Sequence, residues 1–227
     1  MAKQGAPRGV VVITETQHAG RGGFGRVWYS PRGGVWLSIL IKPQGSASSV
    51  HSLPLIAALA IAKVLVQNFT VTAGVRWPND VVVGRQKIAG TLMESESKGN
   101  ELIYAALGIG INANFETREV EAIRDSSTSL LTLTGKPINR EELVVALLTE
   151  MEAMYESFQA RGESAIMEVL RSLDWSRGRR VSVRTADRRI VGVFDDYMSL
   201  DRVQIATRSG PQWVEASTLV SVDYESD

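Results

Sequence analysis

A glycine-rich stretch with two arginines, residues 20–28 (GRGGFGRVW), contains the residue types that most directly indicate chemistry. It follows residues 10–13 (VVVI), an apolar run that predicts a buried strand. Glycine lets a backbone adopt positive φ and approach a ligand closely. Arg21 and Arg26 keep their charge and offer paired donors to a carboxylate or phosphate. The stretch predicts a mobile cationic loop that closes over an anion, and the alternative is an ordinary exposed turn.

A second stretch, residues 76–80 (RWPND), places polar side chains beside a proline. Pro78 has no amide hydrogen and favours an extended Trp77. We therefore expect a bend that displays the side chains of Asn79 and Asp80. The alternative is an Asx-type turn that only opens the next strand.

Two further stretches pair glycines with a functional group. In residues 87–90 (KIAG), Gly90 leaves room for a ligand atom near the Lys87 ammonium, although Lys87 could also be an ordinary edge-strand lysine. In residues 108–112 (GIGIN), two glycines allow close approach and Asn112 could read a base edge, although a β-bulge would explain the same pattern.

A dinucleotide-binding fingerprint is a tempting but poor interpretation of these glycines. Residues 20–25 match G-x-G-x-x-G, and residues 108–113 match its variant ending in alanine. That fingerprint requires the glycines to open a helix, and turn chemistry follows residues 20–25 instead. The G-x-x-x-x-G-K-[ST] phosphate loop does not occur.

Composition excludes several other classes of function. The chain has 227 residues, with 25 Lys plus Arg and 25 Asp plus Glu, so no net field attracts nucleic acid or membrane. With no cysteine and two histidines, disulfides, thiolate nucleophiles and common zinc sites are not expected. The sequence shows no signal peptide and no apolar run long enough to span a membrane. It therefore predicts a soluble cytoplasmic protein.

The elements that must position these residues are predicted from periodicity. Strand-like stretches cover residues 35–41, 75–83, 87–95 and 101–109, and their short connections indicate an antiparallel sheet. A helix with Pro54 in its first turn precedes the second of these stretches, and amphipathic helices are expected at 140–160, capped by Asn139, and at 163–173.

The pattern changes to period two after Trp175 and stays so to the C-terminus. Short runs of Val and Ile separated by turn residues predict a small β-barrel there. We expect two domains, residues 1–174 and 175–227. Four arginines near the start of the second, Arg177, Arg179, Arg180 and Arg184, could help dock a partner or ATP, but a solvated basic face is the alternative.

Taken together, residues 15–22 (ETQHAGRG), 76–80, 87–90 and 108–112 resemble the catalytic domain of biotin–protein ligases. The order and spacing of these motifs and the β-rich tail match over essentially the whole chain. The resemblance implies an α+β fold: a mixed, mostly antiparallel sheet packed on helices, as in class II aminoacyl-tRNA synthetases, with a C-terminal barrel like the Src-homology-3 domain. It implies the short form of the enzyme, without an N-terminal DNA-binding domain.

The implied activity is a carbon–nitrogen ligase reaction in two steps. Biotin and ATP form biotinyl-5′-adenylate, and biotin is then transferred to a lysine of a biotin carboxyl carrier domain. The first step joins two anions, so fixed cations and Mg²⁺ carried on the ATP phosphates are expected to offset their repulsion. The second step needs a neutral amine, and Asp80 is the candidate that accepts or orients its proton.

The resemblance also implies roles for individual residues. The catalytic residues are Lys87, Arg21 and Asp80. The expected biotin-binding residues are Gln17, Gly20, Arg21, Gly22, Gly23, Trp36, Ser38, Lys87, Gly90 and Gly110. The expected ATP-binding residues are Arg21, Arg26, Trp28, Asn79, Asp80, Lys87 and Asn112.

Two departures from the family pattern stand out. The family carries Ser-Thr-Asn on a first strand upstream of the glutamine that matches Gln17, and here that position falls before Met1. We expect the first strand to be absent, through truncation or an internal start, or the pocket to be completed otherwise. Gly23 stands where the family has an arginine, which predicts weaker retention of the adenylate.

Partners and rival functions follow from the same pattern. We expect a carrier-domain partner and a homodimer, with no nucleic acid, no repressor function and no membrane. One rival is a lipoate–protein ligase, although that family favours an Arg-Arg-x-x-Gly-Gly-Gly loop. The other is a non-catalytic relative that binds biotin or adenylate.

Overall fold

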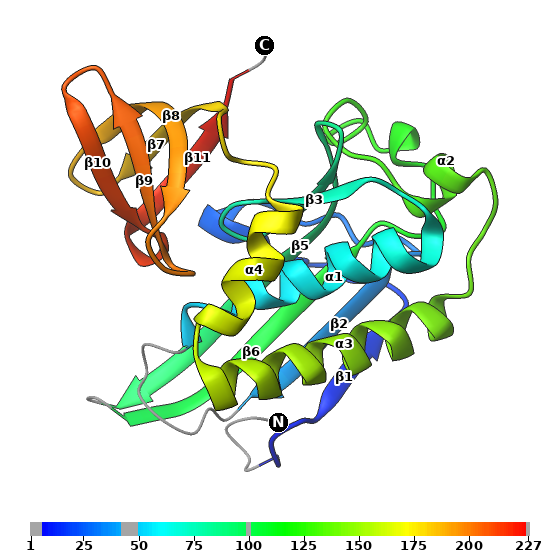
Figure 1. Ribbon diagram of the computed structural model, residues 1–227. Helices are drawn as coiled ribbons and strands as arrows, with labels where there is room; N and C mark the ends of the chain where they lie inside the picture. The colour runs from blue at the N-terminus through cyan, green and yellow to red at the C-terminus, as the bar shows by residue number, and fades with distance from the viewer. Residues whose placement is uncertain (1–5, 42–49, 99–100, 226–227) are drawn as a thin grey trace.

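The larger of the two sheets in the fold has six antiparallel strands (Figure 1). The computed structural model describes residues 6–41, 50–98 and 101–225. The strand order is β1-β2-β6-β5-β4-β3, and each pair of neighbours is antiparallel. The bounds are β1 Val11–Thr14, β2 Val35–Ile41, β3 Ala73–Arg76, β4 Asp80–Val83, β5 Gln86–Lys98 and β6 Glu101–Ile111. The predicted antiparallel sheet is confirmed.

The predicted single stretch over residues 75–83 is wrong. It is a hairpin of β3 and β4 in which Arg76 pairs with Asp80 across a three-residue turn. The turn contains a cis peptide bond between Trp77 and Pro78. Because Pro78 cannot donate an amide hydrogen to a sheet ladder, pairing stops there. The expected bend before Asp80 is therefore present.

The prediction that the strand at residues 10–13 is buried is also wrong. β1 lies at the edge of the sheet, where Val12 is 47% exposed and Ile13 is 55% exposed. An apolar run has the same sequence signature in a central strand and at an edge, so periodicity could not separate the two.

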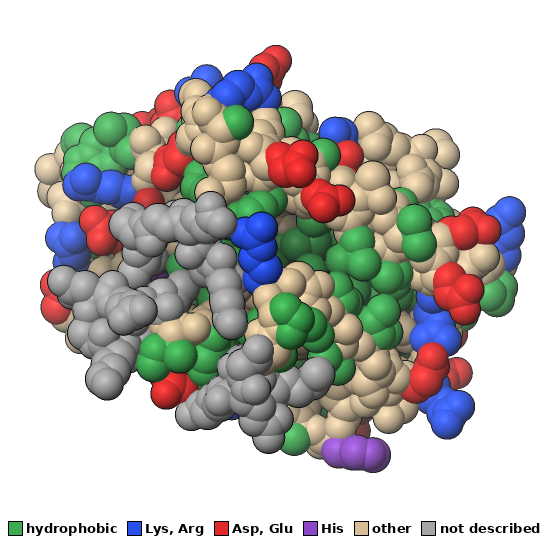
Figure 2. Space-filling view, turned by 90° about the horizontal axis from the view of Figure 1, so that it is seen from below, with side chains coloured by type: hydrophobic (Ala, Val, Ile, Leu, Met, Phe, Trp, Pro, Cys, Tyr) green, Lys and Arg blue, Asp and Glu red, His purple; other side chains and the backbone are tan. Residues whose placement is uncertain are grey.

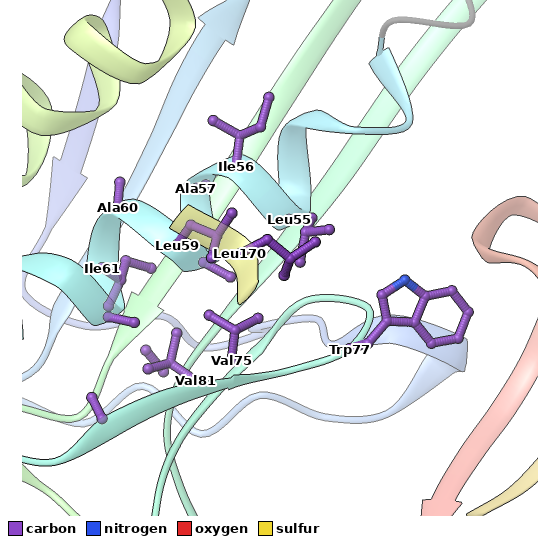
Figure 3. Close-up of a cluster of buried hydrophobic side chains, with 14 of the residues drawn as sticks. Leu55, Ile56, Ala57, Leu59, Ala60, Ile61, Val75, Trp77, Val81 and Leu170 are labelled. Atoms are coloured by element: carbon purple, nitrogen blue, oxygen red, sulfur yellow. The ribbon is translucent and has the colours of Figure 1, made fainter. Parts of the chain in front are cut away.

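Three longer helices cover one face of the sheet (Figure 1). α1 Leu53–Phe69 lies against the sheet and contacts α3 Arg140–Arg161 and α4 Ser164–Leu173. Because α1 is enclosed by the sheet and the other two helices, its leucines and alanines are buried nearly all round (Figure 3). As predicted, Pro54 lies in its first turn.

The cap predicted for α3 is present. The Asn139 side chain accepts from the backbone N–H groups of Glu141 and Glu142, which satisfies two donors that the first helical turn leaves free. The short helix α2 Leu130–Thr134 ends at Gly135, which has positive φ.

A second, five-stranded antiparallel sheet follows the helices, as the period-two pattern predicted (Figure 1). Its order is β10-β9-β8-β7-β11. The bounds are β7 Arg180–Thr185, β8 Arg189–Tyr197, β9 Arg202–Thr207, β10 Gly210–Glu215 and β11 Leu219–Tyr224. The strand pairs described for residues 180–224 do not join β10 to β11, so closure into a barrel stays a prediction.

The alternation of β6 gives the large sheet two unlike faces. Leu107, Ile109 and Ile111 are buried in the core with the helices. Ala106, Gly108 and Gly110 therefore point to the opposite face, because successive strand side chains alternate. The second face is left with a floor of small residues.

The surface carries no dominant sign of charge on the face seen in Figure 2, where basic, acidic and apolar side chains are interspersed. Within the described residues, no helix is long and apolar enough to cross a membrane.

Candidate functional site

A cavity of about 220 Å³ lies over the small-residue face of the sheet. Ser38 of β2, Gly90 and Leu92 of β5, and Ala106, Gly108 and Gly110 of β6 contribute to its lining. The glycine-rich loop, residues 20–23, closes another side. The floor comes from three adjacent strands whose small side chains leave space for a ligand.

Trp28 lies directly on this floor. A Cβ atom at Gly110 would stand 2.5 Å from the Trp28 Nε1 atom, and one at Gly90 would stand 3.2 Å from the Trp28 ring. Glycine is therefore required at Gly110 by close approach. The Lys87 ammonium lies 5.0 Å from the centre of the Trp28 ring, within the range of a cation–π contact. The Trp28 N–H is buried without a hydrogen-bond acceptor among the described residues, so it can donate to a ligand.

A second cavity of about 380 Å³ lies on the other side of Trp28. Its lining includes Arg26, Asp80 and Asn112, together with Ser126 and Ser127. The two cavities share Gly22, Gly23, Trp28, Asn79 and Lys87. An elongated ligand, or two ligands that react with each other, would meet at these shared residues.

The glycine-rich loop folds back on itself. The Gly22 N–H donates to the Arg26 carbonyl at 2.7 Å, and the Arg26 Nε donates to the Gly23 carbonyl at 3.2 Å. Phe24 at the tip has φ +62°, a left-handed conformation that costs energy for a residue other than glycine. A Cβ at Gly20 would lie 2.3 Å from the Trp28 carbonyl oxygen, whereas one at Gly23 would meet no atom within 4 Å.

Arg21 is paired with a carboxylate that sequence reasoning missed. Its Nη2 atom lies 2.8 Å from Oε1 of Glu94 on β5, and the two side chains are 73% and 47% exposed. An ion pair this exposed contributes about 1 kcal/mol or less, so a ligand anion can replace Glu94 at small cost. Only the even spacing of Gly90, Leu92 and Glu94 along the strand could have placed Glu94 on this face.

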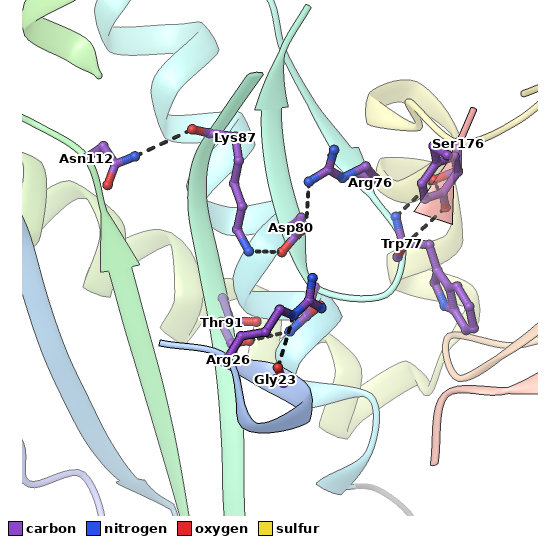
Figure 4. A network of polar contacts seen from close by, with 11 residues as sticks. Gly23, Arg26, Arg76, Trp77, Asp80, Lys87, Thr91, Asn112 and Ser176 are labelled. Atoms are coloured by element: carbon purple, nitrogen blue, oxygen red, sulfur yellow. Dashed lines mark hydrogen bonds and ion pairs between the residues drawn. The ribbon is translucent and has the colours of Figure 1, made fainter. Parts of the chain in front are cut away.

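Asp80 joins two further cations, Arg76 and Lys87 (Figure 4). One of its oxygens accepts from Arg76 Nη2 at 2.8 Å, and the other pairs with Lys87 Nζ. Burial of Asp80, whose side chain is 20% exposed, would raise its pKa. Lys87 and Arg76 outweigh that effect and hold the pKa of Asp80 below its usual value.

The two predicted asparagines use their amide groups within the protein. The Asn79 side chain donates to the Thr91 carbonyl, and the buried Asn112 side chain donates to the Thr128 carbonyl at 3.0 Å. Backbone bonds fix the same region, since the Lys87 N–H donates to the Ser126 carbonyl at 2.9 Å. Ser126 and Ser127 lie in a polar stretch without a motif, so no sequence pattern could identify them.

Every predicted site residue except Trp36 lines at least one of the two cavities. Trp36 is buried behind the cavity wall, where it donates to the Pro31 carbonyl at 2.9 Å and packs edge-on against Trp28. It supports Trp28 from outside the cavity. Gln17 lies at the cavity and accepts from the Ser30 hydroxyl at 2.6 Å.

No group of three or more His, Cys, Asp or Glu side chains suited to a metal occurs in the described part of the chain. Of the four arginines near the second sheet, Arg177 and Arg180 pair with Asp196 and Glu225. Arg179 lies over the Trp175 ring at 3.9 Å.

Comparison with known proteins gives one consistent result. The model of the Biotin/lipoate A/B protein ligase family matches residues 1–112. The chain is 28% identical over 189 residues to the biotin–[acetyl-CoA-carboxylase] ligase of Paracoccus denitrificans, covering 81% of this chain and 78% of that protein. The structure of the Aquifex aeolicus biotin protein ligase in complex with biotin and ATP superposes with a TM-score of 0.85 at 25% identity, covering 99% of this chain and 93% of that one.

In sequence and in fold, the chain is therefore similar to biotin protein ligases. The predicted α+β fold, with antiparallel sheets packed on helices, is confirmed by the same superposition.

Some relatives in the biotin protein ligase family are longer. The bifunctional ligase/repressor BirA of Bacillus subtilis is 29% identical over 187 residues, which are 82% of this chain and 58% of BirA. The chain thus spans less than two thirds of the length of these BirA relatives.

The Asp80 network predicts a pH-dependent loss of stability in Asp80→Asn. Because the native pKa of Asp80 is lowered, its carboxylate stabilises the fold at pH values above the pKa of the unfolded chain, about 4. That stability is lost as the pH falls through the native pKa. We expect Asp80→Asn to cost about 1–3 kcal/mol at pH 7, and the difference from wild type to shrink below about pH 4.

Urea unfolding at pH 7, 5 and 3 measures this effect. Asp125→Asn is the matched control, because Asp125 is almost fully exposed and should show a small difference at each pH. An Asp80→Asn penalty that stays constant from pH 7 to pH 3 would contradict the network.

Proposed function

We propose that the protein is an ATP-dependent biotin–protein ligase. In the first step a biotin carboxylate oxygen attacks the α-phosphorus of ATP, and pyrophosphate leaves to give biotinyl-5′-adenylate. In the second step a lysine amine of a carrier domain attacks the acyl carbon, AMP leaves, and the ammonium proton passes to solvent. The observation that carries this proposal is the pair of cavities that meet at Lys87 and Trp28.

The charges at this junction suit the first step. Lys87 and Arg21 would hold the biotin carboxylate and then the adenylate phosphate, and Arg26 would bind the ATP phosphates. Fixed cations lower the repulsion between two anions without reorganisation at the moment of reaction. We infer that Mg²⁺ enters on the ATP phosphates and adds further charge neutralisation there, since Asp80 is the only acidic side chain in the lining of the second cavity.

The remaining predicted residues divide between the two cavities. Gln17, Gly20, Ser38, Gly90 and Gly110 would line the biotin side. Trp28 would cover the nucleotide. The buried Asn112 amide already holds Thr128, so we propose that its part in adenine binding is to order the neighbouring Ser126 and Ser127, which line the nucleotide cavity.

The partners and organisation extend the same proposal. The acceptor would be the carrier domain of a biotin-dependent carboxylase, because relatives are named for that reaction. We propose a homodimer in the cytoplasm, with residues 1–174 as the catalytic unit and residues 175–227 as a second unit. The exposed edge strand β1 offers a surface for self-association.

The deciding experiment supplies the protein with biotin, ATP, Mg²⁺ and a carrier domain. We expect pyrophosphate release and a mass increase of one biotinyl group on the carrier lysine. Lys87→Met should lower the rate of adenylate formation at least about a hundredfold, because it removes the cation shared by the two cavities. Arg118→Met, at an arginine that lines neither cavity, is the control and should keep the rate.

Each rival function predicts a different result. Transfer of lipoate in preference to biotin would indicate a lipoate ligase. Tight binding of biotin or adenylate without transfer would indicate the non-catalytic relative.

For the second step we propose that Asp80 orients the incoming lysine. A carboxylate whose pKa is lowered by two cations is a weak base, which favours orientation over proton removal. With pre-formed adenylate, Asp80→Asn should slow transfer to the carrier about tenfold or more. An unchanged transfer rate in this variant would remove Asp80 from the second step.

Gly23 should set how long the adenylate stays bound. Position 23 has open space and no positive φ, so Gly23→Arg can be accommodated without strain. We expect the added guanidinium to slow adenylate dissociation about tenfold, as a charge-assisted contact does. Dissociation of purified adenylate from both proteins measures this, with Gly23→Gln as the uncharged control. Equal dissociation rates in wild type and Gly23→Arg would show that Gly23 does not limit retention.

A further inference from the structure

The turn between β3 and β4 is held by side chains from outside the large sheet. The backbone N–H of Trp77 donates to the Ser176 Oγ at 2.9 Å, and the Trp77 carbonyl lies 3.2 Å from the hydroxyl of Tyr224 on β11. That hydroxyl also lies 2.9 Å from the Ser176 Oγ. Ser176 and Tyr224 therefore satisfy both polar backbone groups of Trp77, and Figure 4 shows Ser176 beside the Trp77 backbone.

The clamp formed by Ser176 and Tyr224 on the Trp77 backbone lies in a well-packed region. Trp77 and Ser176 are buried, and the Trp77 ring contacts the Phe194 ring at a centroid distance of 6.0 Å. The Tyr224 ring meets Trp175 edge-on at 5.3 Å. Burial raises the pKa of Tyr224, so its hydroxyl stays protonated and remains a donor.

The clamped turn leads directly into the site. Asn79 is the last residue of the turn and Asp80 is the first residue of β4. A third cavity, of about 240 Å³, is lined by Arg26, Asn79 and Asp80 on one side and by Tyr224 on the other. Trp77, whose backbone is held, thus precedes Asn79 and Asp80 by only two and three residues.

We propose that Tyr224 and Ser176 are positioning residues for the ATP half of the reaction, acting through the Trp77 backbone on Asn79 and Asp80. This inference rests on the proposed function. It gives the C-terminal sheet a part in the chemistry, since the last strand of that sheet orders the turn that carries two residues of the nucleotide cavity. Gln17 and Ser38 line the first cavity and not the second, and they lie on other strands and loops that this turn does not hold.

Two conservative variants of the full chain test the clamp. Tyr224→Phe keeps the ring against Trp175 and removes the hydroxyl, and Ser176→Ala removes the other hydroxyl. Pyrophosphate release should show the KM for ATP raised about tenfold in each variant, with the KM for biotin within about twofold of wild type. The double variant should be no worse than the more affected single variant, because both hydroxyls hold the same turn.

Val203→Ala is the matched control for stability. Val203 is buried in β9 and has no polar side chain to bond the Trp77 backbone, so its truncation should lower the melting temperature and leave the KM for ATP unchanged. A KM for ATP that rises as much in Val203→Ala as in Tyr224→Phe would overturn the inference. Equal rises in the KM values for ATP and biotin would also overturn it.

Hydrogen exchange tests, without relying on activity, whether the two hydroxyls hold the turn. Amides of residues 77–83 should exchange faster in Tyr224→Phe and Ser176→Ala than in wild type, while those of α1 should not change. Unchanged exchange in residues 77–83 would contradict the clamp. If wild type made no adenylate, the proposed function would fail, and the exchange rates would still show whether the hydroxyls hold the turn.

Discussion

The contact between Trp28 and the glycines of two adjacent strands is the constraint on which the site depends. An indole can rest on a β-sheet at this distance only where the strands lack side chains, and Gly90 and Gly110 meet that condition. The same strands bury Ile109 and Ile111 against the helices on the other face. The hydrophobic core and the cavity floor are thus alternate residues of one strand, so a one-residue shift in register would destroy both.

Three cations of the site, Arg21, Arg76 and Lys87, are paired with protein carboxylates. Arg21 pairs with Glu94, while Arg76 and Lys87 share Asp80. The pairs differ in burial, and burial decides how they respond to an anion. The exposed Arg21 pair is cheap to break, whereas the partly buried Asp80 pairs lower a pKa and keep the sheet hairpin in place. Arg21 can therefore leave Glu94 and move with the loop, whereas Lys87 is held in a fixed position by Asp80.

Much of this arrangement could be predicted from the sequence, because local patterns report local structure. The strand-like stretch at residues 101–109 and Asn139 before an amphipathic stretch identified a strand and a capped helix correctly. The exposure of Val12 and Ile13 could not be predicted, since it depends on which strand lies next to β1. The family resemblance implied that Trp36 lines the biotin cavity. Its indole is instead held behind Trp28 by the Pro31 carbonyl, a contact that only the folded loop creates.

Glu94 and Tyr224 show the same limit more sharply. Neither lies in a recognisable motif, and each acts on a residue far away in the sequence: Glu94 on Arg21, and Tyr224 on Trp77. A buried backbone N–H and carbonyl must find partners, and a tight turn cannot supply them from its own ladder. The partners for Trp77 come from Ser176 and from the last strand of the second sheet. The geometry of the turn between β3 and β4 therefore depends on how the second sheet docks against it.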